Sequence, residues 1–544
     1  MYSNKENVNI LTSLLVSHQV TYAVLCPGSR NAPIVHNLVS CSDIECYPVT
    51  DERSAGFYAL GMAQYLCQPV AVCVTSGSAL LNLMPAVAEA YYQHIPLVVI
   101  SADRPAEWID QLDGQTLPQP DALGRFVRKA VTLPEFGPSL HWHCNRLVNE
   151  TLLACRQQGG GPVHINVPIS EPLYEFTMPE LPEERHLSLA PATCNRLSLL
   201  LCVEEFVAAQ RPMIMVGQSS LEKLMLEDFH DIAGRALILN EALSIGCGGC
   251  HFDELLATEE IPEEEKPDFL LYLGDMLVSK HMRQFLRSLP DIPMWQVSED
   301  GQLHDTTMHF TGLIEGHPAD VLQMLGEEIS KRKTHLSSSF IEWWDEKLSE
   351  VDEQITDTQP PFSSRLAVKM LEEKLGDATD CYTHYANSTA VRLANTYATH
   401  YVYCNRGVNG IEGSLSTAAG FSLVTDETVY CVIGDLSFFY DSNALWNQEL
   451  RGNLRILLLN NGGGAIFEKF EGLKGSPARE RFVMARHTTS AEGICQSYGI
   501  HYRAAHNTEE LAAALNWLTQ ESTDLSQADR PQLLEVFVTN GNGT

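Results

Sequence analysis

Residues 429–467 read VYCVIGDLSFFYDSNALWNQELRGNLRILLLNNGGGAIF, in which two short apolar runs flank a helix-like segment. The first run, Val429 to Ile433, ends at Gly434-Asp435, and the second, Ile456 to Leu459, ends at the NNGGG of residues 460–464. This pattern predicts two parallel strands of a β–α–β unit. The carboxyl ends of parallel strands share one edge of the sheet, where doubly wound folds bind ligands. We therefore expect Asp435 and Asn461 to lie side by side.

The residues at these two strand ends carry oxygen atoms suited to a hard cation. A carboxylate, an amide and a bare carbonyl match the preference of Mg²⁺, which usually keeps water and phosphate oxygens as its other ligands. Glycines let the backbone approach such a ligand closely. The alternative is an ordinary β–α–β unit with turn residues at its ends. A GD and an NN about twenty-six residues apart, each closing an apolar run, favour the ligand site.

Composition bounds the class of protein. The chain has 544 residues, 44% of them hydrophobic and 19% charged, which is typical of a globular protein with two or three domains. Its formal net charge of −33 argues against nucleic acid or an anionic membrane as a general partner. An anionic substrate would need a local cluster of Arg and Lys. No apolar run reaches membrane-span length and residues 1–20 lack a signal-peptide layout, so we expect a cytoplasmic location.

The fifteen cysteines are scattered, and several lie inside apolar runs, as reduced core thiols do. Cys247-Gly-Gly-Cys250-His251 matches the attachment pattern of c-type haem. Covalent haem attachment generally requires export, and no export signal is present. We interpret this segment as a glycine-rich loop with incidental cysteines.

Strand-like and helix-like segments alternate along the whole chain, which predicts an α/β fold of three doubly wound parallel-sheet domains. We expect the domains at 1–178, 195–330 and 360–544, separated by a proline-rich acidic linker and by a charged stretch that ends in Gln359-Pro360-Pro361. The expected strands of the first domain are 21–26, 44–49, 70–74, 97–100 and 163–168, with one helix over 79–92. Those of the second are 211–217, 236–240, 268–274 and 293–297.

The first and third domains share a spacing that indicates internal duplication. Glu52 is followed 24 residues later by Ser76, and a strand ends 25 residues after that at Ser101. Glu412 is followed 22 residues later by Gly434, and a strand ends 26 residues after that at Asn460. Convergence on a common β–α–β length is the alternative explanation.

Seven segments carry a resemblance to a known family. They are CPGSR (26–30), TDERSAGFYALG (50–61), TSGSALLN (75–82), SADRP (101–105), NRGVNGIEGSLSTAAG (405–420), GDLSFFYDSNAL (434–445) and NNGGGAIF (460–467). Together they closely resemble the SEPHCHC (2-succinyl-5-enolpyruvyl-6-hydroxy-3-cyclohexene-1-carboxylate) synthases, a family of thiamine diphosphate (ThDP) enzymes in menaquinone biosynthesis. ThDP enzymes generally show GDG where this chain has Gly434-Asp435-Leu436, and the GDLS form is typical of this family.

The resemblance implies a pyrimidine-binding module at 1–178, a middle domain, and a diphosphate-binding module at 360–544. ThDP and Mg²⁺ (or Mn²⁺) would bind between the first module of one subunit and the third module of another, in a homodimer or a dimer of dimers. The implied reaction decarboxylates 2-oxoglutarate and adds the succinyl carbanion equivalent to isochorismate. Two alternatives stay open: an acetolactate synthase-like carboligase, and a non-catalytic ThDP-binding homologue.

The resemblance also implies roles for individual residues. Glu52 would be the catalytic carboxyl at N1′ of the aminopyrimidine, and Ile411 would hold ThDP in its bent form. Asp435, Asn461 and the Gly463 carbonyl would bind the metal. The other residues expected at the cofactor are Ser388, Gly434, Leu436, Ser437, Gly464, Ala465 and Ile466.

Both implied substrates are dicarboxylates, and arginine holds carboxylates bidentately. The residues expected to contact substrate are Ser29, Arg30, Arg104, Gln115, Lys280, Ser388, Arg392, Arg406, Ile466 and Phe467. The four arginines fall in loops at expected strand ends or cofactor-facing turns. No histidine is expected as an acid or base, and we interpret His94 and His384 as structural.

Overall fold

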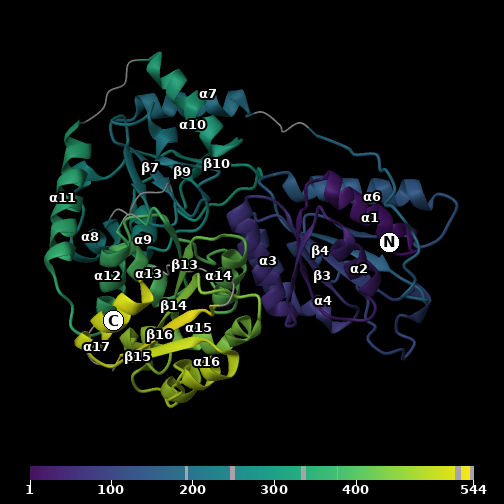
Figure 1. Cartoon of the computed structure of the whole chain (residues 1–544). Helices are drawn as coiled ribbons and strands as arrows, with labels where there is room; N and C mark the ends of the chain where they lie inside the picture. Colours follow the sequence, from purple (N-terminus) through teal and green to yellow (C-terminus); the bar gives the residue numbers. More distant parts are fainter. Residues whose placement is uncertain (190–193, 245–250, 333–337, 377, 521–528, 539–544) are drawn as a thin grey trace.

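The computed structural model describes the chain except for residues 190–193, 245–250, 333–337, 377, 521–528 and 539–544. Its named strands form three sheets, and every pair of neighbouring strands within them is parallel (Figure 1). The predicted α/β class with three parallel sheets is therefore confirmed. The Cys247 and Cys250 of the haem-like pattern lie outside the described residues.

The first sheet has the order β2-β1-β3-β4-β6-β5. Its strands are β1 (Tyr22–Leu25), β2 (Glu45–Pro48), β3 (Val70–Val74), β4 (Leu97–Asp103), β5 (Ala130–Thr132) and β6 (Val163–Pro168). Its helices are α1 (Glu6–Ser17), α2 (Ala32–Ser40), α3 (Glu52–Leu66), α4 (Ser78–Asn82), α5 (Met84–Tyr92) and α6 (Leu140–Arg156).

Two expectations for this sheet need correction. The single helix expected over 79–92 is divided at Leu83 into α4 and α5, because Pro85 in the first turn of α5 has no N–H to continue α4. Strand β4 runs to Asp103, beyond its expected end at Ile100, since Ala102 and Asp103 still pair with β6.

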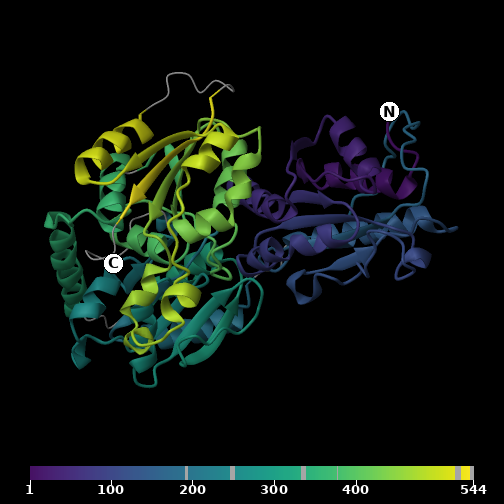
Figure 2. The same cartoon turned by 90° about the horizontal axis from the view of Figure 1, so that it is seen from below.

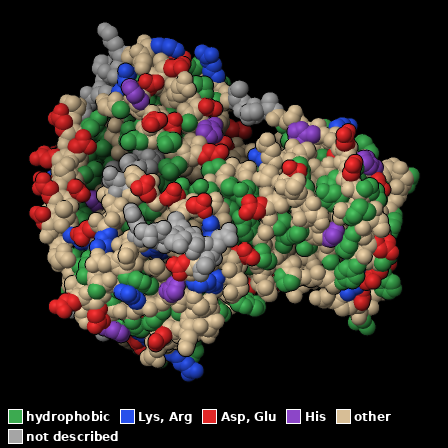
Figure 3. Space-filling model, viewed as in Figure 1, with side chains coloured by type: hydrophobic (Ala, Val, Ile, Leu, Met, Phe, Trp, Pro, Cys, Tyr) green, Lys and Arg blue, Asp and Glu red, His purple; other side chains and the backbone are tan. Residues whose placement is uncertain are grey.

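The second sheet has the order β11-β10-β9-β7-β8. It contains β7 (Pro212–Val216), β8 (Leu237–Asn240), β9 (Phe269–Leu273), β10 (Met294–Ser298) and β11 (Phe310–Glu315). Around it lie α7 (Arg196–Ala208), α8 (Phe252–Thr258), α9 (Lys280–Ser288), α10 (Pro318–Ser330) and α11 (Ser338–Asp357). Strand β11 was not among the predicted strands, and it is an edge strand in which only Ile314 is fully buried. Acidic side chains gather at the edge of the molecule where α11 lies (Figures 1 and 3).

The third sheet has the order β12-β13-β14-β16-β15. It contains β12 (Cys381–Tyr385), β13 (Thr428–Gly434), β14 (Leu454–Asn460), β15 (His501–Ala505) and β16 (Gln532–Phe537). Its helices are α12 (Ser364–Leu375), α13 (Thr389–Tyr397), α14 (Ser414–Leu423), α15 (Asp435–Tyr440), α16 (Glu492–Tyr498) and α17 (Thr508–Leu518). Without its edge strand β2, the first sheet has the same order as the third, which supports internal duplication.

Helices α3 and α14 join the first and third sheets through a shared apolar core (Figures 1 and 2). Glycines bring the two backbones into close approach. A Cβ on Gly61 would lie 2.0 Å from the Thr417 carbonyl oxygen, and a Cβ on Gly420 would lie 2.2 Å from the Tyr58 carbonyl oxygen. The clash is with backbone atoms, so a side-chain rotation cannot relieve it.

We expect Gly61→Ala to lower the free energy of unfolding by about 1–3 kcal/mol or more, because overpacking at this junction forces the two helices apart. Gly493→Ala is a matched control: Gly493 lies in α16 with open space around its Cβ position. That change should be neutral or slightly stabilising. Thermal and denaturant unfolding of both variants would check this, and equal stability would contradict the packing argument.

Candidate active site

Asp435 lies at the centre of a dense set of backbone hydrogen bonds. It is the first residue of α15, and its carboxylate is buried. Its Oδ1 accepts the Leu436 N–H at 2.7 Å, and its Oδ2 accepts those of Asn461 at 3.1 Å and Gly463 at 2.9 Å. Burial raises the pKa of Asp435, whereas the N–H groups of Gly463 and Leu436 act to lower it. The expected approach of Asp435 and Asn461 is thus present.

The glycine loop after β14 has a backbone that other residues would not tolerate. Gly462 has φ +72° and Gly463 has φ +142°, and a Cβ on Gly463 would lie 2.6 Å from the Met484 carbonyl oxygen. The Gly464 N–H donates to that same carbonyl at 2.7 Å. The N–H of Gly464, one of the residues expected at the cofactor, is therefore bonded within the chain.

His487 is a neighbour of Asp435 that the sequence did not reveal. Its Nε2 lies 3.3 Å from Asp435 Oδ2, and its backbone N–H donates to the Gly462 carbonyl at 3.1 Å. The adjacent Arg486 donates to the Asn461 carbonyl at 3.2 Å. His487 belongs to no strand end and no recognisable motif, so only the fold brings it to the glycine loop.

The donor set around Asp435 fits a divalent cation. The described residues contain no group of three or more His, Cys, Asp or Glu that could hold a metal. A cation beside Asp435 would instead need carbonyl and amide oxygens from the glycine loop, plus oxygens of a bound ligand. Mg²⁺ is commonly bound in this way, by one or two carboxylates and substrate phosphates.

Glu52 begins α3, directly after the helix cap Asp51. Its Oε2 accepts a hydrogen bond from Asn82 Nδ2 at 3.1 Å, and its side chain borders an open hollow of about 480 Å³ that Asn443 and Trp446 also line. No hydrogen bond or ion pair among the described residues joins Glu52 to Asp435. Within one chain, the two expected centres of cofactor chemistry have separate surroundings.

The other residues expected at the cofactor or substrate lie on several elements of the third domain. Ser437 Oγ donates to the Ile411 carbonyl, while the Ile411 side chain is 42% exposed. Ser388 has φ +74° and caps α13. Ala465 is buried, whereas Ile466 and Phe467 are half-buried.

One group of expected substrate residues lies at the carboxyl edge of the first sheet. Arg30 Nη1 donates to the Ile169 carbonyl at 2.9 Å, and Arg104 Nε donates to the Gly114 carbonyl at 2.9 Å. Burial lowers the pKa of Arg30, and the nearby Arg104 lowers it further. Ser29 and Gln115 are exposed.

A second group lies where the middle and third sheets meet. Arg392 is exposed and donates to the Ser388 carbonyl at 2.6 Å. Arg406 is buried and donates to Asn387 Oδ1 at 3.1 Å, and its Nε lacks a hydrogen-bond partner among the described residues. Lys280 is exposed at the start of α9.

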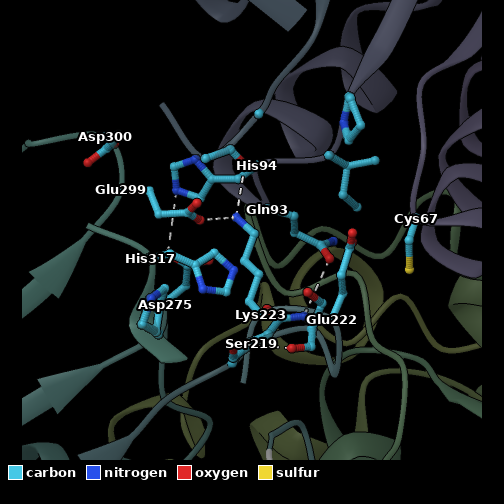
Figure 4. Close-up of a pocket in the computed structure, with 18 of the residues that line it drawn as sticks. Cys67, Gln93, His94, Ser219, Glu222, Lys223, Asp275, Glu299, Asp300 and His317 are labelled. Atoms are coloured by element: carbon cyan, nitrogen blue, oxygen red, sulfur yellow. Dashed lines mark hydrogen bonds and ion pairs between the residues drawn. The ribbon is translucent and has the colours of Figure 1, made fainter. Parts of the chain in front are cut away.

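Another cavity, of about 310 Å³, lies between the first two sheets and contains none of the residues expected to contact cofactor or substrate (Figure 4). In it Lys223 Nζ pairs with Glu299 at 2.8 Å, and His94 Nε2 lies 3.6 Å from Asp275. His384 is elsewhere: it stacks on Tyr403, and burial lowers its pKa to about 3. These contacts agree with structural roles for both histidines.

Two family models match this chain. The N-terminal TPP-binding domain of thiamine pyrophosphate enzymes matches residues 6–123, and the C-terminal TPP-binding domain matches residues 381–536. The fold is similar to a solved thiamin diphosphate-dependent enzyme from Mycobacterium smegmatis, with a TM-score of 0.72, 18% identity, and coverage of 98% of this chain and 99% of that one.

Curated relatives are similar over nearly their whole length. A 2-succinyl-5-enolpyruvyl-6-hydroxy-3-cyclohexene-1-carboxylate synthase of Bacteroides thetaiotaomicron is 43% identical over 99% of this chain and 96% of its own. Enzymes of the same name from Phocaeicola vulgatus (42%; 99% and 96%) and Desulfotalea psychrophila (35%; 98% and 98%) are also similar.

The fold and the two matched domains define a thiamine diphosphate-dependent enzyme. Its cofactor is therefore ThDP, and the glycine loop beside Asp435 is suited to the diphosphate end. More narrowly, the chain belongs to the SEPHCHC synthase family, as the resemblance in the sequence indicated.

We expect Gly463→Ala to weaken ThDP binding by roughly tenfold or more, because a non-glycine residue in this conformation costs about 1–3 kcal/mol. Fluorescence titration with ThDP and Mg²⁺ would measure the change. Gly472→Ala, at a position with open space and no positive φ, is the control. Unchanged affinity in Gly463→Ala would show that the loop conformation is not needed for the cofactor.

Proposed function

We propose that this protein decarboxylates 2-oxoglutarate with ThDP and adds the succinyl unit to isochorismate, giving SEPHCHC and CO₂ in menaquinone biosynthesis. Near-full-length similarity to enzymes named for this product, at up to 43% identity among those compared, carries the proposal. The Asp435 cluster and the two arginine groups are consistent with it. We also expect the protein to act in the cytoplasm.

The Asp435 cluster would hold the metal and the diphosphate. Asp435, the Asn461 amide and the Gly463 carbonyl would bind Mg²⁺, or Mn²⁺ in its place. Gly434, Leu436, Ser437, Gly464, Ala465 and Ile466 would line the diphosphate, since helix N-termini and glycine loops favour anions. The N–H groups of Leu436 and Gly464 would keep their bonds to Asp435 and to the Met484 carbonyl. When bound, ThDP supplies the electron sink for decarboxylation.

Glu52 would act at the other end of the cofactor. Its carboxyl would hold a proton at N1′ of the aminopyrimidine, favouring the tautomer that removes the C2 proton. Glu52 is half-buried and accepts a hydrogen bond only from Asn82 among the described residues, so its second oxygen is available. Ile411 would support the bent cofactor.

The two arginine groups would hold the carboxylates of the substrates. Arg30 and Arg104, with Ser29 and Gln115, would meet one substrate from the first sheet. Arg392 and Arg406, with Ser388 and Lys280, would meet a substrate from the third sheet and α9, against a wall formed by Ile466 and Phe467. Hydrogen bonds to charged groups contribute about 1.5–3 kcal/mol each.

A complete site would need a second copy of the chain. In one chain the contacts of Glu52 and those of Asp435 are separate. Large apolar side chains near both are exposed: Ile411 at 42%, Tyr440 at 50% and Trp446 at 51%. A homodimer, or a dimer of dimers, would cover them and place Glu52 of one subunit opposite Asp435 of the other.

The function itself is tested by incubating the protein with ThDP, Mg²⁺ and 2-oxoglutarate, with and without isochorismate. CO₂ release and a product with the mass of isochorismate plus a succinyl semialdehyde unit are expected. Turnover of pyruvate alone would indicate an acetolactate synthase-like enzyme, and ThDP binding without CO₂ release would indicate a non-catalytic homologue.

Glu52→Gln should keep the fold and ThDP binding but lower turnover by at least about a hundredfold, because the proton at N1′ is lost. Glu509→Gln, an exposed glutamate in the first turn of α17, is a matched control that should keep full activity. Activity of Glu52→Gln close to that of the unmodified enzyme would exclude this role.

Asp435→Asn should raise the Mg²⁺ concentration needed for half-maximal activity by more than about tenfold. Losing a residue that only orients a metal ligand already lowers metal affinity about tenfold or more, and losing the ligand itself should cost at least as much. Activity would be measured across a Mg²⁺ series at saturating ThDP. An unchanged Mg²⁺ requirement would place the metal elsewhere.

A further inference from the structure

Glu241 is a buried carboxylate at the junction of the middle and third sheets that the proposed mechanism does not use. It follows β8 directly and is 1% exposed. Its Oε2 accepts the Val278 N–H at 2.7 Å and its Oε1 accepts the Ser279 N–H at 2.6 Å. Ser279 caps α9, the helix that carries Lys280. Glu241 is therefore fixed to the start of α9.

The segment beside Glu241 is also tied to the third sheet. The Ala242 N–H donates to Asn395 Oδ1 at 3.2 Å, and the Ala242 carbonyl accepts the Val402 N–H at 2.8 Å. Asn395 lies in α13 with Arg392, and Val402 lies four residues before Arg406. These bonds join the segment that carries Glu241 to the segments that carry Arg392 and Arg406.

Charged groups of several elements act on Glu241. Burial raises the pKa of Glu241 to about 7, while its two N–H donors and Arg406 lower it, and Asp253 of α8 raises it. Burial lowers the pKa values of Arg392 and Arg406, and Glu241 opposes that shift in both. Other neighbours among the described residues are Arg283 of α9 and Cys404, which both act on the two arginines. Tyr272 of β9 and His281, which pairs with Asp253 at 3.2 Å, also lie in this cluster.

Arg406 has spare hydrogen-bonding capacity in this cluster. Its Nε is buried without a partner among the described residues, and its Nη1 donates only to an amide oxygen. An unsatisfied guanidinium donor in a buried place is costly unless an acceptor arrives. A substrate carboxylate would supply that acceptor, and it would also add a second negative charge near Glu241.

From these contacts we infer that Glu241 is a positioning residue that couples binding of the 2-oxoglutarate carboxylate at Arg392 and Arg406 to uptake of one proton by the enzyme. The inference rests on the proposed function and adds a control on substrate affinity. When Glu241 is ionised, its negative charge weakens the attraction between the two arginines and the substrate carboxylate. When Glu241 is protonated, that attraction has its full strength.

The direction of the pH effect follows from this competition. Because burial raises the pKa of Glu241 to about 7, we expect a protonated Glu241 and full-strength binding of 2-oxoglutarate at lower pH. Above pH 7 the enzyme must take up a proton to bind, so KM rises with pH. If substrate raises the pKa of Glu241 by one unit, affinity changes by about tenfold across the range. The substrate carboxyls stay ionised throughout, so the effect belongs to the protein.

The test is the KM of the ThDP- and Mg²⁺-loaded enzyme for 2-oxoglutarate from pH 6 to 8.5, at saturating isochorismate. We expect KM of the unmodified enzyme to rise several-fold while kcat changes less. In Glu241→Gln that rise should disappear. A KM that rises equally in Glu241→Gln would overturn the inference.

Glu89→Gln is the matched control. Glu89 is also buried and accepts two backbone N–H groups at 2.7 Å, from Gly407 and Val408 beside Arg406. No arginine contributes to its pKa shift. Glu89→Gln is expected to change KM by a constant factor and to keep its rise with pH. If the rise of KM with pH is lost in Glu89→Gln as well, the rise depends on anchoring of the loop that carries Arg406. That result would overturn the role of Glu241.

A measurement on the unmodified holoenzyme does not depend on how the variants fold. Glutarate, a dicarboxylate without the reactive keto group, is titrated at pH 7.5 in buffers of different ionisation enthalpy. Calorimetry should show uptake of a fraction of one proton per glutarate bound. Binding without proton uptake would overturn the inference and leave the function intact. Absence of any CO₂ release from 2-oxoglutarate would instead contradict the proposed function.

Discussion

The capture of the Asp435 carboxylate by backbone N–H groups is the interaction on which the candidate site depends. Strands β13 and β14 lie side by side in parallel register, so Gly434 and Asn460 end them at the same edge of the sheet. The loop after β14 can fold back onto Asp435 only because Gly462 and Gly463 accept positive φ. One buried carboxylate thus organises a helix start, a strand end and a glycine loop.

A second constraint is the charge of the protein. A chain with a net charge of −33 that binds the proposed dicarboxylate substrates would have to concentrate cations locally. The structure does so in two groups, one at the edge of the first sheet and one between the middle and third sheets. Burying Arg30 and Arg406 is tolerable because carbonyls, amides and nearby carboxylates share their charge. Glu241 is one of these carboxylates, since it and Arg406 shift each other's pKa, and we propose that this links charge balance to substrate affinity.

Much of the fold could be predicted because strands buried on both faces are short continuous apolar runs. Residues 70–74 and 163–168 match β3 and β6 in their bounds. The edge strand β11 was missed because it is only half-buried, and the division of the helix at Leu83 needed the missing N–H of Pro85. His487 could not be predicted as a neighbour of Asp435, because no local sequence pattern marks it. It reaches Asp435 only because its segment folds back onto the glycine loop after β14.

The α/β class, the approach of Asp435 to Asn461 and the resemblance to the SEPHCHC synthase family could all be predicted from the residues. Apolar periodicity, glycine positions and spacing are local properties, and they can be read along the chain. The three-dimensional arrangement was needed to show that Glu52 and Asp435 have separate surroundings within one chain, and that Glu241 interacts with Arg406 of another domain. These arrangements arise from packing between segments that are far apart in the sequence. Burial and the attraction of opposite charges hold them, and neither leaves a pattern in neighbouring residues.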